Sequence, residues 1–456
     1  MNAGRLLTLP KKLLAGLLPI FVAAALSGCS TAHYVVNKKL VGDTAGARPY
    51  TFRSMRAPGN SDSMVVVVAL SGGGYRAAAL AHSVFEVLAD TKIHWDGQSS
   101  SLIDEVDVVT AVSGGSLAAA YFGLNRSNFL REFPQKVLAL DLQSILLQRV
   151  LSPSGVWRQT SSKYGRGDLL QEILDEEIFK GQTYADMSRS RPMIYVNATD
   201  MRYGQRFEFT QEQFDHLCSD LNSVPVARAV AASMAVPVVL SPITIWNYRS
   251  DCPVPLQLMP VSGRAASNNY IHLVDGGLSD NTGLNALLEN VAAHGGLQRT
   301  DEAIRLRGVR KRVIIFVNAQ IPATEKEPDT PHTPGLVRQL QSLVHVPIDR
   351  HSDAKILHLS HAIQQWRIEL HGAVSDTPAT TIDDFHIIEV SLSRANDPLI
   401  AEQLRRIPTG LRIQSDQVET LRRFARDSLA RNPSWLQLLA ELGGDERPTQ
   451  SAASEP

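Results

Sequence analysis

Three short motifs combine glycines with one reactive side chain, and each follows an apolar run. The first, residues 71–77 (SGGGYRA), comes directly after Met64–Leu70. At a turn from strand to helix, free N–H groups point toward one spot at the positive end of the helix dipole. Glycine lets a negative atom come close to the backbone, so Gly72, Gly73 and Gly74 are predicted to form an oxyanion hole. A phosphate site or a plain tight turn is the alternative.

The second motif places a serine where an apolar run gives way to small residues. Ser113 follows the run Val106–Val112 and is itself followed by Gly114 and Gly115. This is the context of a nucleophile elbow, in which a sharp turn lifts a serine hydroxyl off the edge of a sheet. The usual pattern G-x-S-x-G has Ala111 at its first position here, a change of one methyl group. Ser113 is predicted to be a nucleophile, and a simple serine–glycine loop is the alternative.

The third motif is an aspartate followed by two glycines. Asp275 comes directly after the strand-like run Tyr270–Val274 and precedes Gly276 and Gly277. Catalytic residues in open α/β sheets gather at the carboxyl ends of the strands. Asp275 is therefore expected to reach the same crevice as Ser113 and to act as its base. Asp-Gly is also a common way to begin a turn, which is the structural alternative.

The elements that must position these motifs alternate between strand and helix. Further strands are predicted at 193–198, 207–210, 312–317 and 385–390, with a helix at 224–234. Apolar runs without polar breaks are typical of parallel strands that are buried on both faces. We therefore predict an α/β layered domain with a mostly parallel central sheet flanked by helices. Residues 411–442 are predicted to form a C-terminal helical extension with a break near Pro433.

The three motifs, in this order and each after a strand, resemble the patatin-like phospholipase family. The resemblance covers roughly residues 63–290 and includes residues 230–237 (VAASMAVP), which are similar to the A-S-x-A-x-P segment of the family. Ala77 stands where the glycine motif of the family usually ends in glycine. The resemblance implies a patatin-like fold and a Ser113–Asp275 dyad that hydrolyses acyl esters of lipids, without histidine, metal or cofactor. Phospholipase, esterase and acyltransferase activities remain open.

Other functions can be weighed against this hypothesis. The glycine motif also fits a dinucleotide fingerprint, but Asp90 lies at the end of a predicted helix instead of a second strand. A Ser-His-Asp triad would need a histidine after the acid, and none of the 13 histidines lies in a recognisable motif. His386 is expected to be structural, and His351, His358 and His361 lack a metal-binding pattern. A catalytically silent envelope lipoprotein that binds partners through the same fold is the remaining alternative.

The N-terminal residues have the pattern of a bacterial lipoprotein signal. Arg5, Lys11 and Lys12 precede the apolar stretch 13–26, which is short for a membrane span and ends in LSGC. This box resembles the lipobox, so residues 1–28 are predicted to be a signal peptide and Cys29 the lipidated N-terminus. Ser30 is not the aspartate that retains lipoproteins in the inner membrane. We therefore expect a lipid anchor in the outer membrane, on its periplasmic side or at the cell surface.

The remaining cysteines and the composition complete the organisation of the chain. Cys218 and Cys252 are an even pair for an oxidising compartment, and either a disulfide or two separate thiols fits them. Residues 29–62 are predicted to be a lipidated tether, 63–442 the acyl hydrolase domain, and 443–456 a disordered tail. No oligomeric state is specified.

Charge and apolar residues indicate which partners the chain can have. With 45 basic and 46 acidic residues, nothing favours nucleic acid. A membrane lipid is the substrate that the resemblance to the patatin-like phospholipase family implies. The leucine-rich stretch 133–151 is expected to be a buried helix, with a flap that meets lipid as the alternative.

Overall fold

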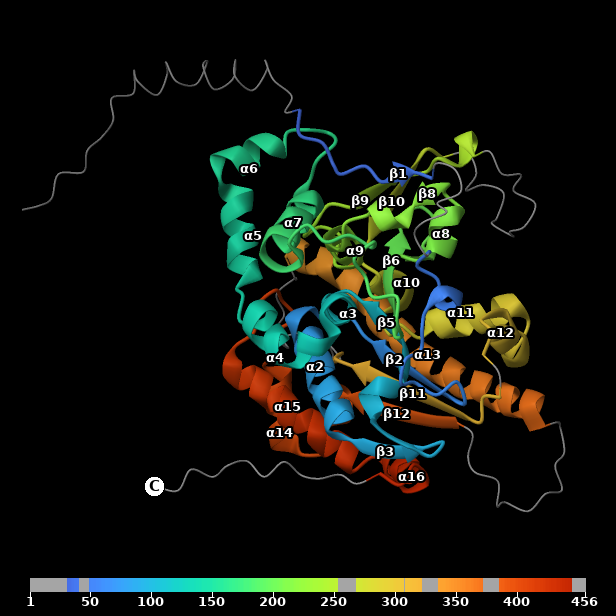
Figure 1. The fold of residues 1–456 in the computed structure, drawn as a ribbon. Coiled ribbons are helices and arrows are strands. Elements are labelled where there is room, and N and C mark those ends of the chain that lie inside the picture. The colour runs from blue at the N-terminus through green and yellow to red at the C-terminus, as the bar shows by residue number, and fades with distance from the viewer. Residues whose placement is uncertain are drawn as a thin grey trace, which may run out of the picture.

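A mostly parallel sheet forms the centre of the computed structural model, which describes residues 31–40, 49–252, 268–306, 308–321, 335–371 and 385–444. The eight strands lie in the order β12–β11–β2–β5–β6–β10–β9, with β7 paired to β6 (Figure 1). Strands β12 to β6 run parallel, while β10 runs antiparallel to both β6 and β9. The predicted α/β class is therefore confirmed. The strands are β2 (Met64–Leu70), β5 (Val106–Val112), β6 (Met193–Asp200), β7 (Arg206–Glu208), β9 (Ile243–Trp246), β10 (Tyr270–Val274), β11 (Lys311–Asn318) and β12 (Phe385–Ser391).

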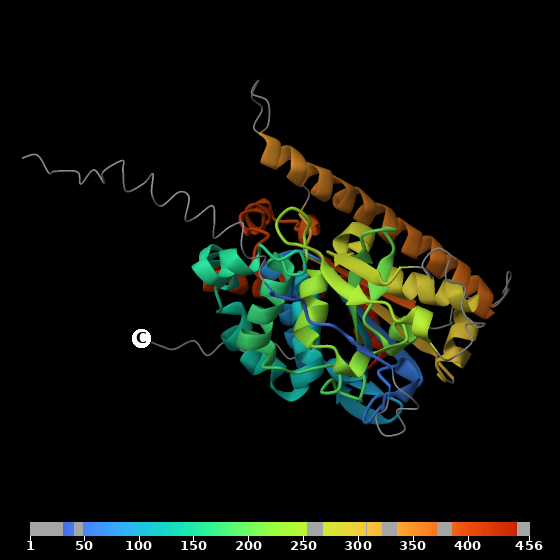
Figure 2. The same ribbon diagram turned by 90° about the horizontal axis from the view of Figure 1, so that it is seen from above.

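The two faces of the sheet bury alternate residues of each strand. Val66 and Val68 face a large apolar core, whereas Ala69, Ile314 and Phe316 face a smaller one. The larger core lies beneath α2 (Gly74–Asp90), α3 (Gly114–Asn125) and α15 (Ser415–Ala430). Helices α11 (Asn285–His294), α12 (Leu297–Ala303) and α13 (Leu336–His371) cover the other face, with α13 along the outside (Figure 2). Burial on both faces explains why the β-branched run of β2 has no polar breaks.

Shorter helices surround this layered centre. Helix α9 (Val226–Ser233) packs against β6 and α3, and α10 (Gly277–Asp280) packs against β6 and α13. Helices α5 and α6 form a corner of the molecule beside α7 (Figure 1). The shorter helices are α4 (Phe129–Phe133), α5 (Leu142–Leu151), α6 (Pro153–Arg158), α7 (Arg166–Leu174), α8 (Gln211–Asp215), α14 (Pro398–Arg405) and α16 (Pro433–Glu441).

Short two-stranded sheets and single turns of helix complete the described secondary structure. One small sheet pairs β3 with β4, and another pairs β1 with β8. These elements are β1 (Lys38–Lys39), β3 (Lys92–Trp95), β4 (Gln98–Ser101), β8 (Ser219–Asp220), η1 (Phe52–Ser54), η2 (Leu102–Glu105), η3 (Arg126–Asn128), η4 (Pro134–Leu138), η5 (Asp175–Phe179), η6 (Leu221–Ser223), η7 (Arg249–Asp251) and η10 (Leu392–Arg394).

The tether predicted at 29–62 is wrong for the described residues in that range. Tyr50 is fully buried, Phe52 is almost so, and the Tyr50 hydroxyl accepts the Ile194 N–H at 3.0 Å. The strand β1 pairs with β8, and Asn37 bonds Ser219 and Trp246. Tyr50 and Phe52 belong to no helical or strand pattern, so the sequence gave no sign that they are buried. The pockets that hold them exist only in the folded domain. The ordered domain therefore begins before residue 63.

The stretch 133–151 also departs from the buried helix that we expected. It begins as a π-helical turn and continues as α5, in which Leu142 is buried but Leu147 and Leu151 are 57% and 67% exposed. Helix α5 packs on α6 and α7 along one side only, so its other apolar side faces solvent. The stretch is therefore buried at its apolar residues Phe133, Val137, Leu138 and Leu142, and exposed along one side of α5.

The predicted lipoprotein signal lies outside the residues that the structure describes. This applies to residues 1–28, to Cys29 and to 445–456 of the predicted tail. Within the described ranges, no helix combines the length and apolar character required to cross a bilayer.

Candidate active site

Ser113 occupies the sharp turn between β5 and α3. Its backbone has φ 50° and ψ −122°, a left-handed conformation that residues other than glycine rarely adopt. The Ser233 hydroxyl accepts the Ser113 N–H at 2.8 Å and itself donates to the Asn197 carbonyl at 2.6 Å. Two neighbouring elements, α9 and β6, therefore hold the strained turn in place. This geometry is that of a nucleophile elbow.

Asp275 lies beside Ser113 although 162 positions separate the two residues. The Ser113 Oγ donates a hydrogen bond of 2.8 Å to Asp275 Oδ2. The other carboxylate oxygen accepts the Gly277 N–H at 2.8 Å, and the Asp275 N–H donates to the Ala235 carbonyl. Strand β10 reaches this place because it pairs antiparallel with β6, so that Val274 lies opposite Thr199. The two side chains thus meet at the carboxyl edge of β5 and β6.

Burial makes the Asp275 carboxylate more basic than an exposed one. Its side chain is 4% exposed, and this desolvation raises the pKa of Asp275 from 3.8 to about 6. Hydrogen bonds from Gly277 and Ser113 lower the pKa, but by less than burial raises it. At neutral pH the group is ionised and is a stronger base than an ordinary carboxylate. It can therefore accept the proton of a serine hydroxyl without a histidine between them.

The glycine loop supplies free backbone donors, but not from all three glycines. The Gly72 N–H donates to the Asn281 carbonyl at 3.1 Å, so the assignment of Gly72 as an oxyanion donor is wrong. Within the described part of the chain, no acceptor occupies the N–H groups of Gly73, Gly74 and Gly114. Sequence alone could not separate these glycines, because the Asn281 carbonyl reaches the loop only in the fold.

Two helix N-termini meet beside Ser113. Helix α2 begins at Gly74 and α3 begins at Gly114, and neither has an acidic residue in its first turn. The backbones of these two glycines touch, since a Cβ on Gly114 would collide with the Gly74 carbonyl. Gly410 leaves no room for a Cβ on Gly74 either, and its carbonyl accepts the Tyr75 N–H at 2.8 Å. The positive ends of both helix dipoles therefore favour a negative charge next to Ser113.

Asn281 is a site residue that sequence reasoning missed. Its Oδ1 fills the position that a Cβ on Gly72 would take, and Ser113 Cβ lies 3.3 Å from the same point. The same Oδ1 and Asp275 Oδ1 lie 2.9 and 3.0 Å from the position of a Cβ on Gly277. The carboxamide therefore lies between the glycine loop and the dyad. Asn281 lies six residues after Asp275, and this short separation is the feature of the sequence that could have indicated a place in the site.

The alternative catalytic groups lie elsewhere. Among the described residues, the Asp275 carboxylate accepts hydrogen bonds from Ser113 and Gly277 and from no histidine. His386 lies near the start of β12, where it is buried against Lys311 and Glu441. The described residues hold no group of three or more side chains arranged to bind a metal.

The residues considered for a dinucleotide site and for a metal site lie on helices. Asp90 ends α2 and pairs with Arg426 at 3.4 Å, instead of following a second strand. His358 and His361 are exposed on α13.

Cys218 and Cys252 form a disulfide with a Cα–Cα distance of 5.7 Å. It connects the turn after α8 to the turn after β9, near the end of the sheet where β10 begins. Cys218 is almost fully buried.

Together the fold and site define an α/β protein with a buried serine–aspartate pair at the carboxyl edge of a parallel sheet. Residues 68–288 match the family model of the patatin-like phospholipase. Over these residues, the match confirms the resemblance that the motifs predicted. A search of curated proteins found no match.

Solved structures resemble the chain more distantly. Human GIVD cytosolic phospholipase A2 is 11% identical, with a TM-score of 0.40, and the match covers 84% of this chain and 60% of that one. VipD from Legionella pneumophila is 11% identical, with a TM-score of 0.29, and the match covers 89% of this chain and 73% of that one. The chain thus spans less than two thirds of the human protein that it matches.

Proposed function

We propose that the protein is a serine acyl hydrolase that cleaves acyl esters of membrane lipids through Ser113 and Asp275. The 2.8 Å hydrogen bond from Ser113 Oγ to the buried Asp275 carboxylate carries this proposal. The match of residues 68–288 to a phospholipase family model supports it. A serine hydroxyl becomes a useful nucleophile only when a base accepts its proton, and Asp275 is placed to do so.

The reaction proceeds in two steps. In the first, Ser113 Oγ attacks the ester carbonyl carbon while Asp275 takes the hydroxyl proton. The negative oxygen of the tetrahedral intermediate accepts hydrogen bonds from the free N–H groups of Gly73, Gly74 and Gly114. The C–O bond to the alcohol then breaks, and the alcohol leaves with the proton from Asp275.

The second step releases the acyl group from Ser113. Asp275 takes a proton from water as the water oxygen attacks the acyl-serine carbonyl. The Ser113–acyl bond breaks, and the proton returns to Ser113 as the carboxylic acid departs. An acyltransferase would use another alcohol in place of water at this step, so the two activities differ only in the acceptor.

Exposed apolar side chains at one end of the molecule support a lipid substrate. Leu147 and Leu151 on α5 and Val156 and Trp157 on α6 are 47–67% exposed. Helix α7, which packs against α5, holds the neighbouring segment through a hydrogen bond from Arg166 to the Val238 carbonyl. Val238 and the adjacent valine are exposed too, and this segment begins at Ala235, whose carbonyl binds Asp275. Large exposed apolar surfaces mark contacts with partners or membranes.

The predicted anchor would bring the same end to a bilayer. The described chain starts beside α6, where the Ala32 carbonyl accepts the Ser161 hydroxyl and the Tyr34 N–H donates to Lys163. A lipid on Cys29 would lie only three residues before Ala32. We therefore propose an outer-membrane lipoprotein whose α5–α6 corner faces the lipid.

A labelling and product experiment tests the catalytic proposal. A fluorophosphonate probe should label Ser113 in the full-length protein, and mass spectrometry should identify fatty acids released from a panel of phospholipids. Ser113→Ala should abolish both signals, and Asp275→Asn should abolish turnover. Ser415→Ala and Asp416→Asn, which change exposed residues of α15, are the matched controls. Absence of labelling in the unmutated protein would instead favour a catalytically silent, partner-binding lipoprotein.

A further inference from the structure

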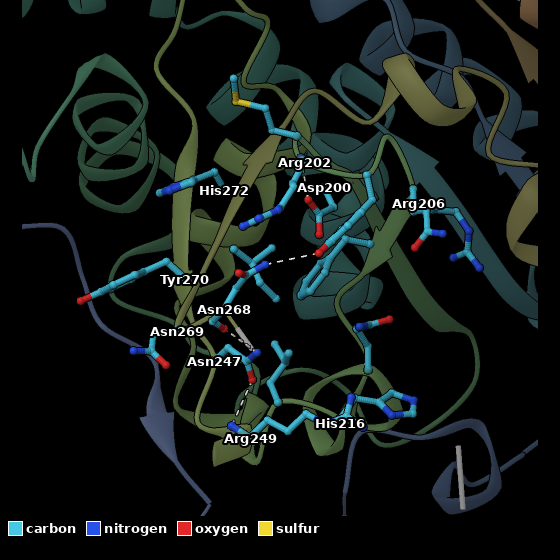
Figure 3. Close-up of a pocket in the computed structure, with 17 residues that line it drawn as sticks. Asp200, Arg202, Arg206, His216, Asn247, Arg249, Asn268, Asn269, Tyr270 and His272 are labelled. Atoms are coloured by element: carbon cyan, nitrogen blue, oxygen red, sulfur yellow. Dashed lines mark hydrogen bonds between the residues drawn. The ribbon is translucent and has the colours of Figure 1, made fainter. Parts of the chain in front are cut away.

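A pocket of about 840 Å³ opens beside the strands that lead to Asp275 (Figure 3). It lies between the turn from β6 to β7, the end of α8 and the start of β10. Its volume falls in the range of pockets that hold small organic molecules. Its lining includes Arg202, Arg206, Arg249, His216, His272 and Asn247. This concentration of cationic and hydrogen-bonding groups has no part in the dyad chemistry.

Two of the three arginines have no carboxylate partner among the described residues. Arg206 is neutralised by Glu208 and Glu289, which bind its guanidinium. In the part of the chain that the structure describes, neither Arg202 nor Arg249 forms a salt bridge. The Arg202 guanidinium lies over the Tyr203 ring at 5.8 Å. Two uncompensated positive charges thus line one pocket.

The acidic and titratable lining groups do not cancel this charge. The Asp200 carboxylate accepts the backbone N–H of Arg202 at 2.8 Å. In the described chain, it does not form a salt bridge with the guanidinium group of Arg202. Burial, followed by the nearby charge of Arg249, lowers the pKa of His216. The imidazole is therefore neutral at neutral pH and can exchange hydrogen bonds with a ligand. Asp200, which also lines the pocket, carries one negative charge, so the positive charge is local to the Arg202 and Arg249 guanidinium groups.

The wall that carries Arg249 is held rigidly. The Asn247 Oδ1 accepts the Arg249 N–H at 3.0 Å, while its Nδ2 donates to the Asn268 carbonyl at 2.8 Å. The Tyr248 N–H donates to the Leu217 carbonyl at 2.9 Å, beside the disulfide from Cys218 to Cys252. When the wall of a pocket is already ordered, the protein loses less conformational entropy on binding a ligand. The site is thus built before any ligand arrives.

We propose that this pocket binds an anionic ligand that carries a phosphate group, with Arg202 and Arg249, at opposite ends of the pocket in Figure 3, as the guanidinium groups available to it. Guanidinium groups match phosphate oxygens with paired, charge-assisted hydrogen bonds. The phosphate belongs either to a lipid headgroup or to a soluble phosphate ester. Strand β10 runs from His272 in the pocket to Asp275 three positions later. A phosphate bound in this pocket would therefore lie next to β10, the strand that precedes Asp275. Its binding does not depend on the proposed catalytic function.

Binding measurements on four full-length proteins test this proposal. They are the unmutated chain, Ser113→Ala, the double variant Arg202→Gln/Arg249→Gln, and Arg423→Gln, an exposed arginine of α15. Calorimetric titration with inorganic phosphate and glycerol 3-phosphate examines soluble ligands. Co-sedimentation with phosphatidylcholine vesicles, with and without phosphatidylglycerol, examines headgroups. Circular dichroism should show the same folded spectrum for all four proteins, because Arg202 is exposed and Arg249 is half-buried.

The double variant should lose at least tenfold in affinity for a phosphate probe, while Arg423→Gln stays within twofold of the unmutated protein. A loss with the soluble probes would identify a soluble phosphate ester as the ligand class. A loss confined to phosphatidylglycerol vesicles would identify a lipid headgroup. Equal binding by the double variant and the unmutated protein, or no binding of any probe, would overturn the proposal. Ser113→Ala should bind normally, so failure of the catalytic proposal would leave this result unaffected.

Discussion

The backbone N–H of Ser113 is held by the hydroxyl of Ser233 at 2.8 Å, across 120 positions of sequence. This bond explains how an elbow with positive φ is kept in place, since the same hydroxyl is bound to β6 through Asn197. The Ser116 hydroxyl bonds Ser233 as well, at 2.8 Å, and the Ser116 N–H donates to the Ser113 carbonyl at 2.9 Å. Ser233 therefore acts as a positioning residue that orients the nucleophile for attack.

We expect Ser233→Ala to lower kcat about tenfold with little change in KM. The lost hydrogen bond would let the nucleophile leave its attack geometry, and small misplacements cost this much in rate. Fluorophosphonate labelling of Ser113 should slow in parallel. Ser415→Ala, which changes an exposed residue of α15, is the control. A Ser233→Ala protein that labels at the normal rate would contradict this role.

The raised pKa of Asp275 predicts an acidic limb in the rate profile. Only the carboxylate can accept the Ser113 proton, and its pKa is raised to about 6 by burial. The value of kcat/KM should therefore rise with pH and level off above about 6, because protonation below that pH removes the base. Hydrolysis of a neutral, soluble nitrophenyl ester measures this directly. A profile with its midpoint near the ordinary value of an aspartate, about 4, would show that burial does not tune the base.

Asn281 is expected to assist the reaction from the side of the glycine loop. Asn281→Ala should lower kcat about tenfold, since the carboxamide lies against both Gly72 and Gly277. Asn281→Asp should lower it further, on the order of 10²-fold, because a negative charge would face the developing oxyanion. Steady-state kinetics distinguishes these effects from weaker binding. Asn290→Ala on α11 serves as the control, and equal rates for the alanine and aspartate variants would argue for a packing role alone.

The disulfide should contribute measurably to stability. Residues 218 and 252 close a loop with a sequence separation of 34. Chain entropy then predicts a loss of about 3–4 kcal/mol in the free energy of unfolding for Cys218→Ser/Cys252→Ser. Urea unfolding, with and without dithiothreitol, measures this difference. Reductant should bring the unmutated protein and Cys29→Ser to the level of the double variant, and insensitivity to reductant would contradict the pairing.

The α5–α6 corner should contribute to vesicle binding beyond any lipid anchor. Leu151→Ser/Trp157→Ser removes two exposed apolar side chains, each worth about 1.5–3 kcal/mol when fully buried. We expect at least a tenfold loss of binding to phosphatidylcholine vesicles in co-sedimentation. Leu399→Ser is the control, because Leu399 is 75% exposed on the separate helix α14. Equal losses in both proteins would mean that exposed apolar area anywhere suffices.

The sequence by itself determined the central strands and the chemistry at their ends. The runs Met64–Leu70, Val106–Val112 and Tyr270–Val274 form strands with the predicted bounds. An uninterrupted β-branched run is stable as a strand only when both faces are covered, so the local pattern already implied a layered fold. Ser113 follows β5, a parallel strand, in agreement with the rule that catalytic groups gather where such strands end. Asp275 follows β10, which is antiparallel, so its place beside Ser113 depends on the pairing of β10 with β6.

Only the tertiary structure decided which groups meet and which donors remain free. Sequence does not reveal that the Asn281 carbonyl occupies the Gly72 N–H, or that Gly410 lies against Gly74. It also placed Leu147 and Leu151 in a core, whereas their helix packs along one side only. Local patterns depend on a few neighbouring residues, while hydrogen-bond partners and exposure depend on segments hundreds of positions apart. Those contacts exist only once the chain has folded.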